Sequence, residues 1–598
     1  MPAAAVAAPQ ISLGGQPIAA ALWDDLIELE IDLAASAPGQ VTLRFYDVDG
    51  AHATRRELRI GSKVQVALPR LAGPRRELVD LTPFEVTELG VDAHEGGMRE
   101  LVVVAHDVSH RLALGTKIQT FLQSSPADVL QQVVPQRDIE LEVRDSDMRA
   151  DKLPYFLVAS SPRLVLDELA ARYGLVWWCD DGRIVVDEPG SRAKVSLSYP
   201  DELLSCRTRV TGRYVGRVEV RGWDHTKMDP IVGSATTPTD IPAKDLASAP
   251  GARWSSGEAT ITVTGAAATT PNEAKALAKA IADGAAQRRL DVRGEAHSTP
   301  GLLPGGTVEV RNLGSASGAY EVHRVQHVFR HQSGLRTRFE AGGRGPSLLA
   351  PDPGTASVPS SIHFGGIVVG VVTANDDPGK LGRVRVKFPW LTDQDSSDWA
   401  RVLVFGGGEG QKGARGTHFL PDVNDEVLVG FEGGDLRKPV VLGTLLNPKT
   451  KAFDYQVKGG AVQRRSITSR RGHVLQLVDE TDPKTEGIQM LLADGTTRLR
   501  VGADQVEVET PEGNPISLKS GNASITITKE GDISISGKNV TIESKGDLKV
   551  DSKGNVQVDA AMKTTLTGKL GLTASSQMNT EVSGTAVTTV KGSTVMIN

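Results

Sequence analysis

The stretch GDLKVDSKGNVQVDAAMKTTLTGKLGLTASSQMNTEVSGTAVTTV, residues 546–590, decides how the C-terminal part of the chain folds. Pairs of small aliphatic or threonine side chains, two residues apart, recur in steps of eight with Gly, Asn, Asp or Ser between them. A short fixed period of one strand and one turn is typical of a β-solenoid. One irregularity, Val540/Ile542, falls seven residues after its predecessor; the other pairs are Ile525/Ile527, Ile533/Ile535, Leu548/Val550, Val556/Val558, Thr564/Leu566, Leu572/Ala574, Thr580/Val582 and Thr588/Val590.

Each octad offers only two small side chains to an interior, which is too little apolar surface for one chain to offset its ordering entropy. Three chains wound around one axis would enclose these side chains and pair their backbone groups. The 83 residues from 516 to 598 contain no Phe, Trp, Tyr or Pro, which fits a narrow interior. We therefore predict a triple-stranded β-helix needle, with a single-chain β-helix and a disordered tail as alternatives. The predicted interior residues are Leu548, Val550, Val556, Val558, Leu566, Leu572, Val582 and Val590.

Length and composition bound the rest of the chain. Its 598 residues correspond to about four domains. The net charge of −6 argues against a protein that coats nucleic acid. Two cysteines, Cys179 and Cys206, exclude a disulfide framework and a four-cysteine zinc site within one chain. No apolar run is long enough for a transmembrane helix, and no Lys or Arg precedes Arg44, although a secretory signal would require one. The sequence therefore predicts a mainly β protein made in the cytoplasm.

Turn residues and hydrophobic patterns divide the chain into five segments. The first alternates short strands with three helices, which begin after Ser125, Ser161 and Thr270, the last with Glu273 at capping-box spacing. The second helix carries a predicted apolar stripe of Leu164, Leu166, Leu169 and Ala170, and Asp181-Gly182 predicts a hairpin turn. The second segment is rich in Gly, Pro and Ser, as linkers are. The third holds the strands of a small five-stranded barrel. The predicted segments are a hub region (1–345), a linker (346–361), a barrel domain (362–447), a connecting β segment (448–515) and the octad-repeat needle (516–598).

Several blocks resemble known families. The blocks 161–189 (SPRLVLDELAARYGLVWWCDDGRIVVDEP), 270–295, 302–310 and 320–341 resemble the tail-hub domain of phage late-control D proteins. Residues 365–391 and 399–447 resemble the OB-fold domain of phage baseplate spikes and of the VgrG proteins of contractile injection systems. The most specific parts are GRVRVKFPW (382–390) and FLPDVNDEVLVGFEGGD (419–435), and SRRGHVLQLVDE (469–480) is similar to the stretch that follows this domain in these proteins.

The resemblance implies N-terminal tail-hub β-barrel domains with a few helices, an OB-fold barrel and an intertwined needle. It implies a homotrimeric central spike that caps a hexameric inner-tube protein, contacts baseplate proteins and is driven into the target membrane by sheath contraction, carrying cargo or a tip protein. It also implies assembly in the bacterial cytoplasm, in a phage tail-like particle that acts extracellularly or at the target envelope. We favour an extracellular contractile injection system, and a contractile phage tail and a type VI secretion VgrG stay open.

A cell-wall hydrolase is the alternative of a different class. Glycosidases use two carboxylates with separated pKa values inside a cleft. The adjacent acids Asp479 and Glu480 lie in a turn-rich stretch, where solvated charge is the simpler interpretation. The connecting segment is short for a lysozyme domain, and nothing follows the repeats in this sequence. We therefore expect no catalytic residue and no enzymatic activity.

Other binding chemistries are also disfavoured. GEGQKG at 408–413 matches a dinucleotide fingerprint by letter, but no helix follows it to hold a pyrophosphate. His323, His327 and His331 lie on a predicted strand, where neighbours stand about 13 Å apart and cannot share one metal. Residues 361–450 hold 10 Lys and Arg against 11 Asp and Glu, without the basic groove that single-stranded nucleic acid needs. We expect no cofactor, no metal and no nucleic-acid partner.

The last residues of the octad segment predict a contact with another polypeptide. The end of a triple-stranded β-helix leaves strand ends unpaired and apolar side chains exposed around the axis. No charged residue lies among 594–598 to repel a partner. The predicted docking residues are Val595, Ile597 and Asn598, and the resemblance implies a PAAR-type tip protein as the occupant.

Overall fold

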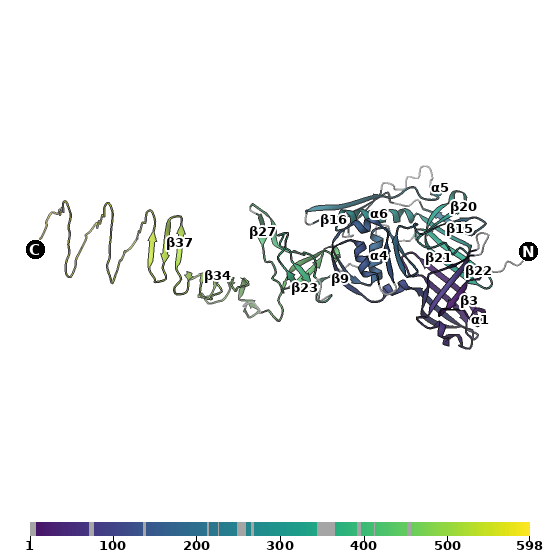
Figure 1. Cartoon of the computed structure of the whole chain (residues 1–598). Helices are drawn as coiled ribbons and strands as arrows, with labels where there is room; N and C mark the ends of the chain where they lie inside the picture. Colours follow the sequence, from purple (N-terminus) through teal and green to yellow (C-terminus); the bar gives the residue numbers. More distant parts are fainter. Residues whose placement is uncertain are drawn as a thin grey trace, which may run out of the picture. The chain divides into compact units, whose positions relative to one another are not determined.

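A computed structural model describes residues 8–70, 77–135, 139–211, 215–224, 227–247, 259–264, 268–343, 365–391, 396–411, 413–450 and 456–597 (Figure 1). The chain forms two compact units, Met1–Thr450 and Lys451–Asn598. Strands outnumber helices among the regular elements of both units, so the predicted mainly β class is confirmed. The predicted linker, 346–361, lies outside the described residues.

The largest element of the first unit is a 14-stranded sheet, in which two distant parts of the chain pair. They meet where β3 runs antiparallel to β21, with Ile31 opposite His327. Strand alternation buries one set of side chains in two clusters, around Phe45 and around Phe339. The strands are β1 Gln10–Leu13, β2 Gln16–Pro17, β3 Leu26–Ala34, β4 Gln40–Tyr46, β5 Lys63–Arg70, β6 Glu77–Asp80, β7 Phe84–Ala93, β8 Arg99–Asp107, β14 Lys194–Ser198, β15 Leu203–Val210, β19 Leu290–His297, β20 Thr307–Arg311, β21 Gly318–Arg330 and β22 Gly334–Gly342.

Three helices begin where the sequence predicts their caps. The side chains of Ser125, Ser161 and Thr270 each accept a hydrogen bond from the backbone N–H three residues on. The predicted apolar stripe of α4 is partly wrong, because Leu164 is exposed and Val165 takes its place on the buried face. The helices are α1 Ala20–Asp24, α2 Pro126–Val133, α3 Ser146–Ala150, α4 Pro162–Arg172, α5 Lys244–Ala247 and α6 Pro271–Gln287; the 3₁₀ turns are η1 His52–Thr54, η2 Arg56–Leu58, η3 Val108–Ala113, η4 Gly314–Ala316 and η6 Glu432–Gly434.

Smaller sheets pack around these helices. The predicted hairpin at Asp181-Gly182 is confirmed, since both residues have positive φ, as a tight hairpin turn requires. At Gly233, β17 approaches α6 so closely that a Cβ atom would lie 2.2 Å from the backbone carbon of Ala274. The strands are β9 Lys117–Ser124, β10 Glu140–Val143, β11 Leu153–Ser160, β12 Val176–Asp180, β13 Arg183–Asp187, β16 Arg217–Asp224, β17 Asp229–Thr236 and β18 Thr260–Val263.

A small five-stranded barrel completes the first unit. Its strand order is β24-β23-β28-β29-β25, and an antiparallel bridge between Val384 and Ala400 joins the two ends of this order. Val372, Phe388 and Val429 belong to its separate core. The strands are β23 Ile367–Ala374, β24 Arg385–Lys387, β25 Arg401–Val402, β28 Glu426–Phe431 and β29 Pro439–Leu445, with a glycine-rich hairpin of β26 Phe405–Gly410 and β27 Gly413–Thr417.

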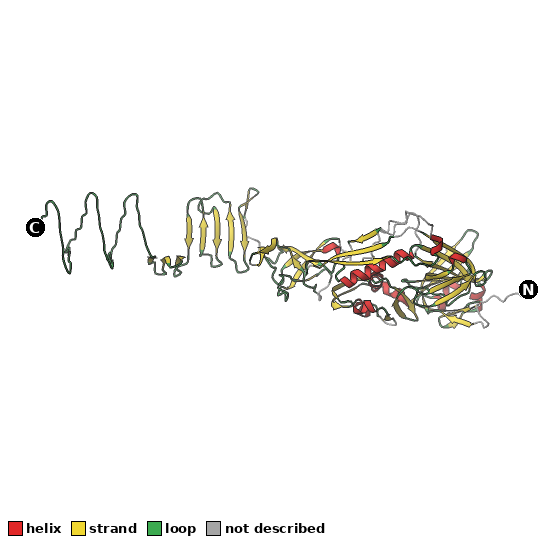
Figure 2. Cartoon of the chain, turned by 90° about the horizontal axis from the view of Figure 1, so that it is seen from above, coloured by secondary structure: helices red, strands yellow, loops and turns green. Residues whose placement is uncertain are grey.

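The second unit contains a five-stranded antiparallel meander, β32 to β36, whose strands lie side by side in Figure 2. Each strand pairs with the next along the chain, so all its pairings are local. The strands are β30 Val457–Lys458, β31 Ala461–Val462, β32 Arg464–Thr468, β33 Val474–Val478, β34 Gly487–Leu491, β35 Arg498–Val501 and β36 Val506–Glu509.

The octad segment begins differently from the sequence-based expectation. β37 Ile516–Ser520, β38 Ala523–Ile527 and β39 Ile533–Ser536 pair within the chain as an antiparallel sheet. Their reversals use Gly521 and Gly531, both with positive φ. Gly546 and Gly554 have no positive φ, and there the chain bends instead of reversing. The irregular step at Val540/Ile542 marks this change.

From residue 537 the described chain forms no strand and bends at a fixed period, and its trace has the form of a wave in Figure 2. The bends lie at 545–546, 553–554, 561–562, 569–570, 577–578, 585–586 and 593–594, in steps of eight. The octad period read from the sequence is therefore also the period of the backbone. Among the described residues, no helix combines the length and apolar character needed to cross a bilayer.

Candidate functional site

The eight predicted needle-interior residues are exposed in the single chain. Their side chains leave between 64% and 76% of their surface accessible, although every one of them is Leu or Val. Apolar surface repeated at this regularity is characteristic of a face that another chain covers. Their burial in a trimer stays a prediction.

The backbone of the same segment is also without partners of its own chain. Between residues 537 and 597 the structure describes extended chain and bends, and no ladder of paired strands. Extended backbone whose N–H and C=O groups lack a neighbouring strand is a template for pairing with another chain. The same residues therefore expose their apolar side chains and have no neighbouring strand to pair with their backbone.

A second uncovered apolar face lies on the β32–β36 meander. Cross-strand neighbours form two rows, Leu475–Met490–Leu499–Val508 and Leu477–Ile488–Val501–Val506. Seven of these eight side chains expose between 40% and 68% of their surface, all except Leu499. On the other face, Gln476 donates a hydrogen bond to Gln489, and Arg500 pairs with Asp504. One face of this single layer is therefore apolar and bare.

This apolar face was not predicted from the sequence, although the sequence carries a signal for it. In VLQLV (474–478) and IQML (488–491), two large apolar residues stand on either side of a glutamine, two positions apart. That alternation is typical of a strand with one covered face. The segment looked mixed because loops rich in charged residues separate these short strands.

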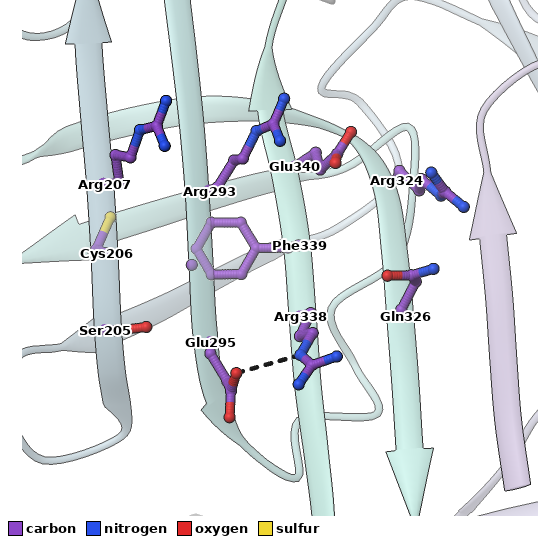
Figure 3. Close-up of a pocket in the computed structure, with 11 residues that line it drawn as sticks. Ser205, Cys206, Arg207, Arg293, Glu295, Arg324, Gln326, Arg338, Phe339 and Glu340 are labelled. Carbon is purple, nitrogen blue, oxygen red and sulfur yellow. Dashed lines mark hydrogen bonds and ion pairs between the residues drawn. The ribbon is translucent and has the colours of Figure 1, made fainter.

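The hub sheet carries a charged cavity of about 370 Å³ on strands β15, β19, β21 and β22 (Figure 3). Four arginines and two glutamates contribute to its lining, so the cavity carries net positive charge; they are Arg207, Arg293, Arg324, Arg338, Glu295 and Glu340. Glu295 accepts a hydrogen bond of 3.1 Å from Arg338, and Asp32 on β3 holds Arg324.

Arg207 and Arg293 distinguish this cavity from an ordinary ladder of charge pairs. They are direct cross-strand neighbours, and like charges in that relation destabilise a sheet. Arg293 is compensated by Asp291 at 3.2 Å, whereas Arg207 makes no ion pair with any described residue. The cavity therefore presents one uncompensated cation and suits an anionic group of a partner surface.

A buried ion cluster joins the barrel to the helices of the hub. Arg437 follows η6 of the barrel, and its guanidinium lies 2.9 Å from Glu273 and 2.9 Å from Asp435. Arg172 on α4 reaches the same Glu273 oxygen at 3.0 Å. Next to Arg437, Leu436 enters the core of the hub helices. Salt bridge and apolar contact together fix the barrel against the hub.

The electrostatics of this cluster hold its groups charged. Burial alone would raise the pKa of Glu273, but Arg437 and Arg172 outweigh it and lower this pKa to about 2. Burial opposes the charge of Arg437, yet Glu273 and Asp435 raise its pKa. Glu273 was predicted only as a helix-capping residue, and its side chain also accepts hydrogen bonds from Thr269.

The residues weighed for catalysis and metal binding lie apart. Asp479 and Glu480 pair with Arg465 and Arg464, and Arg464 lowers the pKa of Glu480. Of the three histidines, His327 is fully buried, whereas His331 is exposed and contacts the carbonyl oxygen of Trp23. In the part of the chain that the structure describes, no group of three His, Cys, Asp or Glu is arranged to hold a metal.

Comparisons with known families assign the barrel. The family described as the type VI secretion system/phage-baseplate injector OB domain matches residues 368–446. These residues include the five strands of the barrel and Arg437. A second family, described as the Alg8 N-terminal domain, matches residues 85–330 of the hub.

Solved structures with similar folds include tail and secretion proteins. A 43 kDa tail protein of prophage MuSo2 from Shewanella oneidensis is 15% identical, with a TM-score of 0.42 over 56% of this chain and 98% of its own. The E. coli type VI secretion component c3393 is 14% identical, with a TM-score of 0.41 over 70% and 97%. A chain of the lidless PdpA-VgrG complex is 9% identical, with a TM-score of 0.46 over 89% of this chain and 99% of its own.

The family match lies on the barrel whose closed strand order and core are described above, and it agrees with the resemblance seen in GRVRVKFPW and the block at 419–435. The barrel at residues 368–446 therefore matches the injector OB domain of type VI secretion systems and phage baseplates.

Proposed function

We propose that this chain is the structural central spike and hub of a contractile injection machine. In this role it caps the inner tube and punctures the target envelope when the sheath contracts. The observation that carries the proposal is the octad segment, whose bends recur every eight residues while its apolar side chains and backbone stay uncovered. An injector OB domain in the same chain supports the assignment to this class of machine.

The active form in this proposal is a homotrimer. Two separate features call for cover by further copies: the bare face of the β32–β36 meander and the octad side chains. Burying a Val or Leu side chain contributes about 1.5–3 kcal/mol, so eight such positions per chain outweigh the loss of freedom on association. Three copies of one single-layer sheet, each turning its apolar face inward, enclose a common core.

The proposed domains follow the predicted boundaries, with one adjustment. The hub spans 1–345, the OB domain 362–447 and the connecting segment 448–515. Within the needle, 516–598, the intertwined winding begins at 537, because residues before that point already pair within their own chain.

The proposed partners are chosen from the surfaces that remain open. The hub meets the hexameric inner tube and baseplate proteins, and the uncompensated Arg207 cavity suits an anionic patch on one of them. Val595 and Ile597 are exposed apolar residues that a PAAR-type tip protein would cover; Asn598 lies outside the described residues. No nucleic acid takes part.

We place the chain in a phage tail-like particle that is assembled in the bacterial cytoplasm and acts extracellularly or at the target envelope. An extracellular contractile injection system is the favoured machine, and a contractile phage tail and a type VI secretion apparatus are the alternatives. Neighbouring genes distinguish them, because capsid genes indicate a phage and a membrane complex indicates type VI secretion.

A cell-wall hydrolase is less well supported. A general acid needs a raised pKa beside a second carboxylate in a cleft. Glu480 has a lowered pKa in its contact with Arg464. Burial, then Asp283 and Glu188, raise the pKa of Glu321 to about 7, but its carboxylate accepts a hydrogen bond from Gln287 inside the hub.

Light scattering on the purified full-length protein tests the proposal. The expected mass is three times that of the chain, and removal of residues 537–598 should lower both trimer stability and heat resistance. A folded monomer with full β content would overturn it. A zymogram with peptidoglycan provides the second check, in which a clear zone abolished by one carboxylate substitution would favour the hydrolase.

A further inference from the structure

The second residue of each octad bend, which we call the corner position, changes character along the segment. It is occupied by Gly546, Gly554, Met562, Leu570, Met578, Ala586 and Thr594 in order, and Lys538 forms a single-residue bend one octad before Gly546. Three consecutive corners, at 562, 570 and 578, therefore carry long apolar side chains, flanked on both sides by small or polar residues. The function proposed above makes no use of them.

These corner side chains point away from the segment. Met562, Leu570 and Met578 are 98%, 105% and 98% exposed, well above the range of the predicted interior residues. Lys538 forms the bend one octad earlier, where a dry interior would not accept a lysine. A Cβ atom added at Gly546 or Gly554 would meet no atom within 4 Å. The corners are thus outward positions with room for large side chains.

The charge pattern changes at the same place. Between 545 and 559, three lysines alternate with three aspartates. Between Asp559 and Glu581 the only charged residues are Lys563 and Lys569. The apolar corners therefore lie among lysines that have no acidic neighbour. A surface that combines outward apolar side chains with unpaired lysines is complementary to an anionic membrane surface.

We propose that Met562, Leu570 and Met578, together with Lys563 and Lys569, form an outer band that binds anionic lipid. The inference rests on the proposed homotrimer, in which each chain contributes its three corners and two lysines around the same levels of the needle. The lysines attract the lipid headgroups, and the apolar corners insert among the acyl chains. The band gives the needle its own affinity for a bilayer, in addition to the force that drives it.

Flotation of the full-length trimer with vesicles tests this band. We expect binding to phosphatidylglycerol vesicles at least about tenfold tighter than to phosphatidylcholine vesicles, and weaker binding at high salt, because salt screens the lysines. The combined variant Met562→Ser, Leu570→Ser, Met578→Ser should lose about tenfold or more while remaining trimeric. Lys563→Gln with Lys569→Gln should remove the preference for phosphatidylglycerol.

Matched variants separate the band from the rest of the needle. Lys545→Gln with Lys553→Gln removes the same charge outside the band and should leave binding unchanged. Gly546→Met with Gly554→Met extends the band into open space and should strengthen binding.

Each contrary result has a distinct meaning. A wild-type protein that is not trimeric would overturn the proposed function and this inference with it. A trimer that binds neither vesicle, or both equally, would overturn the band alone. A serine variant that loses the trimer would place the corner residues in the core and also overturn it.

Discussion

Nη1 of Arg437 lies 2.9 Å from Oε1 of Glu273, across 164 residues of sequence, and both side chains are almost completely buried. This contact places a charge of the OB domain at the first turn of α6 in the hub. Since the cluster has two arginines around one Glu273 oxygen, that carboxylate is the centre of the junction.

Glu273→Gln should destabilise the first unit by about 3–5 kcal/mol, because it leaves two buried guanidinium groups without their shared anion. Calorimetry of the full-length protein measures the loss. Asp283→Asn on the same helix breaks the exposed ion pair with Lys279 and should cost less than about 1 kcal/mol. Equal effects of the two changes would contradict the central role of Glu273.

The same carboxylate predicts how stability depends on acid. Its pKa is about 2 in the folded protein, below its ordinary value of 4.5. The stability it contributes is therefore present above about pH 4.5 and is lost as the pH falls through about 2. Unfolding curves of wild type and Glu273→Gln should converge at low pH. Curves that keep their separation down to pH 2 would show that Glu273 is not ionised in the fold.

His327 should produce a separate acid dependence. It is fully buried, accepts or donates a single hydrogen bond with Thr337, and burial lowers its pKa to about 4. Because the unfolded chain binds this proton below about pH 6.5, stability should fall between pH 6.5 and 4, by about 3 kcal/mol in all. His327→Gln should flatten this part of the profile. The exposed His331→Gln serves as the control and should leave the slope in place.

Val558→Asp should reduce the yield of trimer steeply. In the proposed needle it places three carboxylates at one level of the axis, and each buried unpaired charge costs several kcal/mol. Gln557→Asp, one residue earlier on the other side of the strand, should leave the trimer intact. Light scattering measures the mass of the two variants in solution. A Val558→Asp variant that is still fully trimeric would show that Val558 does not lie in the interior.

Met490→Lys should weaken the trimer through the connecting segment. Met490 lies in the middle of the bare face of the meander, between Leu475 and Leu499. Gln476→Lys puts the same charge on the polar face of a neighbouring strand and should have a smaller effect. Subunit exchange measured by mixing labelled trimers reports the difference. Identical exchange rates would mean that the apolar face is not an interface.

The features that were predicted correctly from the sequence depend on residues that lie close together along the chain. The caps at Ser125, Ser161 and Thr270 and the turn at Asp181-Gly182 each depend on residues within one turn of each other. The octad period likewise reappears in the bends of the backbone.

What the sequence did not predict depends on residues far apart or on backbone conformation. Glu273 has the pattern of a capping residue, and no residue near it in the sequence indicates its contact with Arg437. Residues 516–536 share the apolar pairs of the later octads, and only the positive φ of Gly521 and Gly531 turns them into hairpins. The apolar face of the meander was hidden because its short strands are divided by polar loops.

The bends at steps of eight also determine how the length of this segment can change over time. Because side chains alternate between the two sides of a strand, insertion or loss of one residue would turn every later apolar pair outward. Whole octads can be gained or lost without that consequence, since each repeats the same strand and bend. The length of the segment can therefore change only in steps of one octad per chain. Duplication of 24 nucleotides of coding sequence adds one such step.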